Sequence, residues 1–228
     1  MKNKVFVAAA ALAIAMSGAQ AADLPVVPPP IAATPAPAND WSGFYLGVHG
    51  GYGFGQTDMS INGGAFTTDY DIDGWLVGGQ AGFNIQSGMW LFGVEADIAY
   101  SSIDGSYSDT AAFDQTAITD INWLATIRAR AGLHYDWWMP YITGGVAFAD
   151  VDHTISPTGI VVLGASLSDT LVGWTVGGGV EAMFNPNWTA KLEYLYVDLE
   201  DVSFTSGGDF GTFDEDFHVI RAGLNYHF

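Results

Sequence analysis

The chain has 228 residues, and charged residues make up only 14% of it, about half the share of an average soluble domain. Its formal net charge of −19 excludes the basic surface that nucleic-acid binding requires, so no nucleic-acid partner is expected. The absence of cysteine excludes disulfides and thiolate metal ligands.

Residues 1–21, MKNKVFVAAAALAIAMSGAQA, have the form of a secretory signal peptide. Two lysines precede an apolar run from Val5 to Met16, and Ala19-Gln20-Ala21 is a small-residue cleavage site. The run is too short for a spanning helix, which needs about 20 apolar residues. Cleavage after Ala21 removes two cations and no acid, which leaves four cations against 25 acids.

Residues 22–40, ADLPVVPPPIAATPAPAND, are rich in Pro and Ala and show no periodicity. This composition predicts an extended, polyproline-like linker on the periplasmic side of the outer membrane. The structured domain is therefore expected to comprise residues 41–228.

From Trp41 onward the sequence alternates between apolar and polar or glycine residues with period two, which predicts β-strands with one apolar face. The final stretch FHVIRAGLNYHF keeps this alternation up to Phe228. We expect eight strands, at about 43–55, 74–85, 90–100, 122–135, 139–150, 171–184, 188–199 and 217–228.

The predicted connections are of two kinds. Short turns around QSG, DWW and NPN alternate with four long connections that carry most of the acids. An even number of strands of about ten residues, with short turns at one end and long loops at the other, is typical of outer-membrane barrels. The predicted fold is all-β, an eight-stranded antiparallel up-and-down transmembrane β-barrel.

The positions of the charges separate this fold from a water-soluble barrel, which is apolar inside and polar outside. Four cations and four acids fall on the polar strand faces: Glu95, Asp97, Arg128, Arg130, Glu181, Lys191, Glu193 and Arg221. A charge that faces lipid at the midplane costs about 2–4 kcal/mol. We therefore expect these side chains to form a charge network in the lumen. If Phe184 faces Trp188 across the NPN turn, Glu181 faces Lys191.

All eight tryptophans lie at the ends of predicted strands, which indicates two aromatic girdles at the membrane surfaces. Trp75, Trp123 and Trp174 are placed at the end of the long connections. At the end of the short turns lie Trp90, Trp138 and Trp188, together with Trp41 and Trp137.

Several segments together resemble the small outer-membrane β-barrel proteins of alpha-proteobacteria, the porin-like surface-antigen family. They are WSGFYLGVHGGYGFG, WLVGGQAGFN, FGVEAD, IRARAGL, PYITGGVAF, GWTVGGGVEAMFNPNWTAKLEYLYVDL and VIRAGLNYHF. The resemblance covers nearly all of residues 41–228 and implies a fold like the membrane domain of outer-membrane protein A. It also implies that Tyr226 and Phe228 form the signal read by the barrel-assembly machinery.

The expected role is that of an integral outer-membrane protein with acidic extracellular loops and a lumen closed by charges, structural or surface-interacting and not enzymatic. Lipid and lipopolysaccharide are expected neighbours, and the oligomeric state stays open. A small porin for passive diffusion or a haemin-binding surface protein are the alternatives. Haem would use His153 or His218, although DEDFH, residues 214–218, reads more simply as a solvated charge run. No catalytic residue, metal site or cofactor is predicted.

Overall fold

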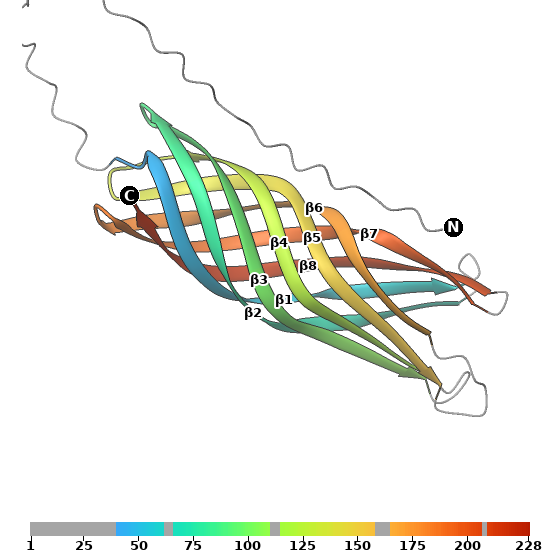
Figure 1. Ribbon diagram of the computed structural model, residues 1–228. Helices are drawn as coiled ribbons and strands as arrows, with labels where there is room; N and C mark the ends of the chain where they lie inside the picture. The colour runs from blue at the N-terminus through green and yellow to red at the C-terminus, as the bar shows by residue number, and fades with distance from the viewer. Residues whose placement is uncertain (1–39, 62–65, 110–114, 158–164, 207–208) are drawn as a thin grey trace, which may run out of the picture. The chain divides into compact units, whose positions relative to one another are not determined.

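A computed structural model describes residues 40–61, 66–109, 115–157, 165–206 and 209–228. The expected signal peptide and most of the linker lie outside these residues. The described chain forms a closed barrel in which every strand pairs antiparallel with its sequence neighbours (Figure 1). The strands are β1 (Gly43–Ile61), β2 (Phe66–Ser87), β3 (Trp90–Asp109), β4 (Gln115–Leu133), β5 (Trp138–Pro157), β6 (Ala165–Asn185), β7 (Trp188–Ser206) and β8 (Asp209–His227). This confirms the predicted fold class and strand number.

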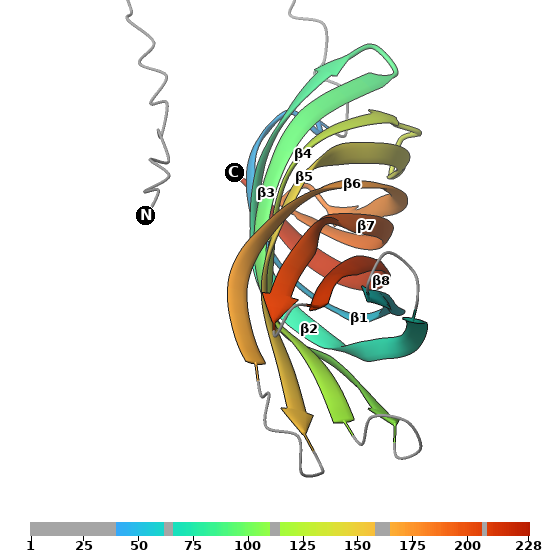
Figure 2. The same ribbon diagram turned by 90° about the vertical axis from the view of Figure 1, so that its right-hand side faces the viewer.

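The barrel closes between its first and last strands. β1 pairs with β8 over a register that begins at Tyr45 opposite His227 and continues to Ile61 opposite Gly211. The two views in Figures 1 and 2 show β8 beside β1, with the C-terminus at the end of the tight turns. Because lipid offers no hydrogen-bond partner to an open strand edge, the alternating pattern has to run to the last residues of the chain. No helix within the described residues is long and apolar enough to cross a membrane.

The strands are longer than the sequence predicted. Each contains 19–22 residues, so much of what was expected as long acidic loops is paired β-structure. Register shifts lie between Tyr100 and Ile103 and between Ile121 and Trp123, where the predicted strands ended. Such irregularities interrupt the period-two pattern without ending the hydrogen-bonded ladder, which explains why the prediction stopped there.

The two faces of the sheet are distributed as predicted. Apolar side chains such as Ile142 and Phe44 are 69% and 67% exposed on the outer face. Inward positions hold charged side chains such as Arg128, which is 1% exposed. This arrangement is the inverse of a water-soluble barrel.

The NPN turn differs from the prediction by one position. Trp188 pairs with Asn185 rather than with Phe184, because a register shift lies between Met183 and Asn185. Beyond this irregularity Glu181 pairs with Lys191, as expected.

Candidate functional site

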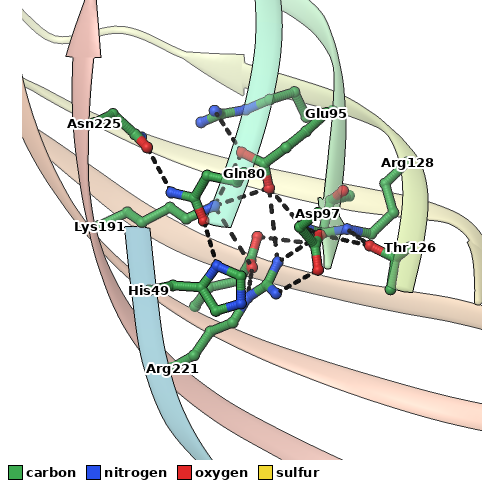
Figure 3. Close-up of polar contacts among 12 residues, drawn as sticks. His49, Gln80, Glu95, Asp97, Thr126, Arg128, Lys191, Arg221 and Asn225 are labelled. Carbon is green, nitrogen blue, oxygen red and sulfur yellow. Dashed lines mark hydrogen bonds and ion pairs between the residues drawn. The ribbon is translucent and has the colours of Figure 1, made fainter. Parts of the chain in front are cut away.

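The candidate site is the group of eight charged side chains inside the barrel, called here the lumen cluster. It consists of Glu95 and Asp97 on β3, Arg128 and Arg130 on β4, Glu181 on β6, Lys191 and Glu193 on β7, and Arg221 on β8. Each is at most 6% exposed. Period two places all of them on inward positions, and barrel closure brings five strands to one lumen (Figure 3).

Arg128 lies at the centre of the lumen cluster and contacts three carboxylates. Its Nη2 is 2.5 Å from Glu95 Oε1 and 2.9 Å from Asp97 Oδ2, and its Nη1 is 3.0 Å from Glu193 Oε1. Its Nε donates to Thr126 Oγ1 at 2.8 Å. The guanidinium therefore has a partner on each of its three nitrogens.

Arg221 approaches two of the same carboxylates from β8. Its Nε lies 2.6 Å from Glu193 Oε2, and its Nη1 lies 2.9 Å from Asp97 Oδ1. Asp97 and Glu193 thus each bridge two arginines. Shared carboxylates join the pairs into a network in which no partner can be lost without leaving a buried charge.

The predicted Glu181–Lys191 pair is not the one formed. Lys191 Nζ lies 2.8 Å from Glu95 Oε1, across the lumen, and Glu181 Oε2 lies 2.6 Å from Arg130 Nη2. Thr189 and Asn225 donate to the other oxygen of Glu181, at 2.5 and 2.8 Å. Glu181 and Lys191 face each other on adjacent strands, but both side chains point into a narrow lumen. Each therefore reaches a partner on another strand rather than the other member of the register pair.

Two tyrosines that were not predicted as site residues donate hydrogen bonds to the lumen cluster. Tyr45 Oη donates to Glu95 Oε2 at 2.7 Å, and Tyr141 Oη donates to Glu193 Oε1 at 3.0 Å. Arg130 also lies over the Tyr141 ring, with Cζ 4.2 Å from its centroid. Tyr45 and Tyr141 occupy inward-facing positions in the alternation of their strands, and this pattern could have identified them.

A second polar group borders the charges. His49 Nδ1 lies 2.8 Å from Gln80 Oε1, and Gln80 Nε2 donates to Asn225 Oδ1 at 2.5 Å (Figure 3). His49 and His227 are buried inside the barrel. His134 is half-buried and contacts Gln86 at 2.8 Å.

Apolar layers, which were not predicted, lie on both sides of the lumen cluster. At the tight-turn end the layer consists of Trp41, Leu91, Met139, Tyr141 and Met183. Toward the far ends of the strands a larger group includes Leu76, Ile103, Leu124, Leu195 and Phe217. The lumen is therefore occupied by three successive layers of side chains.

Trp41 does not belong to an aromatic girdle. Its side chain is 0% exposed, and its Nε1 donates to the carbonyl of Asp136 at 3.5 Å. Its backbone N–H donates to Gln86 Oε1 at 3.0 Å. Trp41 precedes the first strand, so the alternation could not reveal which way its ring points.

Six of the eight tryptophans assigned to the girdles lie on the outer face of a strand. Trp75, Trp90, Trp174 and Trp188 are 51%, 55%, 49% and 42% exposed, and Trp123 and Trp138 are half-buried. Tyr226 and Phe228 also point outward, and the Phe228 N–H donates to the carbonyl of Phe44 at 3.1 Å.

The structure describes the side chain of only one of the two histidines proposed for haem. The side chain of His153 lies outside the described residues, and His218 points outward, where its Nδ1 is 2.7 Å from Tyr194 Oη. Among residues whose side chains are described, no group of three or more His, Asp or Glu is arranged to hold a metal ion.

Comparisons with known proteins agree with this architecture. A family model described as "Outer membrane protein beta-barrel domain" matches residues 6–228. The chain is 35% identical over 244 residues to a 31 kDa outer-membrane immunogenic protein of Brucella melitensis biotype 1, covering 99% of this chain and 100% of that protein. It is 34% identical over 196 residues to a 22 kDa outer membrane protein of Rhizobium leguminosarum bv. viciae, covering 84% and 80%.

A solved structure supports the fold. The outer membrane protein OprG of Pseudomonas aeruginosa matches with a TM-score of 0.53 at 15% identity, and the match covers 82% of this chain and 97% of that chain. At this identity the likeness concerns the fold alone.

Proposed function

The chain belongs to the outer-membrane β-barrel family and is an integral outer-membrane protein, and from this premise we propose that it is a closed, non-enzymatic barrel with a structural and surface-interacting role. The lumen cluster is the observation that carries the proposal. Four cations and four carboxylates, buried and joined by ion pairs, occupy the bore that a diffusing solute would need. An eight-stranded barrel has an interior just wide enough for side chains to fill.

The apolar layers add to this argument. Trp41 and its neighbours lie on the tight-turn side, which is periplasmic in bacterial outer-membrane barrels. The group around Leu124 and Leu195 lies on the other side of the charges. A polar solute would meet an apolar barrier before and after the charged layer, so rearrangement of one ion pair would not open a continuous polar path.

The exposed ends of the barrel support the surface role. Beyond the apolar belt the outer face carries acids on neighbouring strands, with Asp73 opposite Asp104 and Asp104 opposite Asp120. We propose that these ends are displayed outside the cell, and the similarity to a protein named as an outer-membrane immunogenic protein supports this proposal. Lipopolysaccharide would be the immediate neighbour of this acidic zone.

The last strand supports a role for Tyr226 and Phe228 in biogenesis. Phe228 is 73% exposed at the tight-turn end, so an assembly factor on the periplasmic side can reach it. Deletion of Phe228 should lower the amount of assembled barrel in cells and leave refolding of the purified protein into detergent unchanged. Equal loss in both assays would mean that Phe228 acts on folding itself.

The function is tested by single-channel recording of the refolded protein in a planar lipid bilayer. The closed barrel should give no discrete openings, whereas the alternative, a small porin, should give them. Arg128→Ala and Arg128→Lys are recorded beside it, because only the first removes the central cation. Discrete openings of the unmodified protein that grow in Arg128→Ala would replace the closed barrel with a pore obstructed by charge.

A further inference from the structure

A groove crosses the outer face of β2, β1 and β8 just beyond the apolar belt. In the register of these strands, Phe54 lies between Asp73 on one side and His218 on the other. The next outward residue, Gln56, lies between Asp71 and Asp216. All six side chains point away from the lumen, so the two rows form one continuous patch.

The patch is hollowed. A cavity of about 540 Å³ is lined by the rings of Tyr52, Phe54 and His218 and by the carboxylates of Asp71, Asp73 and Asp216. Aromatic rings thus form part of a groove whose other polar groups are mainly acids.

Contacts within the groove hold its side chains in place. The His218 ring lies 5.4 Å from the Phe54 ring, and its Nδ1 is 2.7 Å from Tyr194 Oη. Tyr52 Oη donates to Asp73 Oδ2, and Gln56 Nε2 donates to Asp71 Oδ1 at 3.3 Å. These donors are neutral, so they orient the two carboxylates without cancelling their charges.

Among the described residues, no Lys or Arg side chain is near enough to neutralise the groove. All four Lys and Arg side chains of the described residues are buried in the lumen. A cationic ligand would therefore meet carboxylates that no described Lys or Arg side chain of the protein pairs with. Carboxylates repel a phosphate, whereas aromatic faces with carboxylates favour an organic ammonium group, which rings attract through their quadrupole.

The place of the groove indicates where such a ligand comes from. In the adjacent row, on the membrane side, Tyr52 lies between Trp75 and Ile220, which are 51% and 48% exposed on the apolar belt. With the tight turns in the periplasm, this height is that of the outer-leaflet headgroups. We propose that the groove binds the organic ammonium headgroup of an amphiphile whose apolar chain lies along the belt.

The test is a titration with dodecyltrimethylammonium of the refolded, isotope-labelled protein in dodecyl maltoside micelles. The NMR signals of the Gln56 side-chain amide and the His218 ring report on the groove, and ionic strength is held constant because salt screens exposed charges. We expect saturable shifts of these signals. Asp216→Asn should weaken binding by about fivefold, from the loss of one unit charge at contact distance in water.

Two matched variants separate the groove from the general acidity of the barrel. Asp120→Asn removes a carboxylate at similar height on β4, outside the groove, and should leave the affinity unchanged. Phe54→Ala keeps every charge and should weaken binding about two- to fivefold through the lost ring contact. Both side chains are outside the lumen, and unchanged unfolding midpoints confirm that the variants are folded.

Three outcomes would overturn the proposal. Equal weakening by Asp120→Asn and Asp216→Asn would mean diffuse attraction by acids. Unaltered affinity in Phe54→Ala would remove the ring from the site. Tetramethylammonium binding as tightly as dodecyltrimethylammonium would exclude a membrane-anchored ligand as the preferred occupant.

Discussion

Lys191 and Glu95 are separated by 96 positions in the sequence, yet Lys191 Nζ donates to both carboxylate oxygens of Glu95, at 2.8 and 2.9 Å. The contact spans the lumen from β7 to β3, which are not neighbours in the barrel. Such a pair exists only when the barrel is closed. Part of the energy of the lumen cluster is therefore gained when the last strand joins the first.

This relationship predicts strong coupling between the two residues. Lys191→Met and Glu95→Gln should each destabilise the barrel, because each leaves an opposite charge buried. The double variant should cost less than the sum of the singles, with a coupling of about 0.5–3 kcal/mol in unfolding by urea in detergent. Gln86→Ala, at the edge of the tight-turn end, is the control for additivity. Its change in the free energy of unfolding should add to that of Lys191→Met.

Arg128→Ala should cost more than Lys191→Met. Arg128 lies within 3.0 Å of three carboxylates, whereas Lys191 lies 2.8 Å from Glu95 and 4.0 Å from Glu193. Removal of one partner from a buried ion pair costs about 3–5 kcal/mol. The measurement is the urea midpoint in detergent, and Arg128→Lys is the control that keeps the charge. An unchanged midpoint in Arg128→Ala would show that the ion pairs at this site do not stabilise the barrel.

The sequence was sufficient to find the members of the lumen cluster but not their pairing. Parity along a strand decides which residues point inward, and that property is local. Which partner a side chain reaches depends on strand tilt and stagger around the closed barrel, which no single strand specifies. Glu181 and Lys191 are the clear case, since the predicted register is correct and both form their ion pairs elsewhere.

The apolar layers could have been read in part from the sequence. Leu76 and Leu124 have the same parity as Gln80 and Arg128, which marked them as inward residues. The length of the strands could not be read, because the register shifts near Tyr100 and Ile121 break the alternation. Trp41 precedes the first strand, and only tertiary contacts decide its position.

Beyond the membrane belt, neighbouring acids should make the barrel more stable as the pH falls. Burial together with the carboxylates of Asp104 and Asp152 raises the pKa of Asp120, and burial with several nearby acids raises the pKa of Asp214. A carboxyl whose pKa is raised in the folded state binds its proton more tightly when folded. Its contribution to stability is therefore fully present below the ordinary pKa of about 3.9. This contribution is lost as the pH rises through the raised pKa of the folded state.

The contribution of Asp120 is isolated by comparing the protein with Asp120→Asn. Unfolding midpoints in detergent are measured from neutral pH down to the ordinary aspartate pKa of about 3.9. The variant should be the more stable at neutral pH, and the difference should shrink on acidification. Asp40→Asn removes an acid at the tight-turn end and controls for net charge. A constant difference between Asp120→Asn and the unmodified protein at every pH would contradict the raised pKa.

Trp41 provides a test of whether the layers close the lumen independently. Its ring is 0% exposed beneath the lumen cluster, so Trp41→Ala should destabilise the barrel by about 3–5 kcal/mol through the cavity that it leaves. Trp137→Ala is the matched control, because Trp137 is 58% exposed at the same end of the barrel and its loss should cost far less. Trp41→Ala should still show no channel openings in a planar bilayer, since the charges and the far apolar layer remain in place. Openings in the single variant would mean that Trp41 is the principal barrier and that the lumen cluster passes ions once the ring is removed.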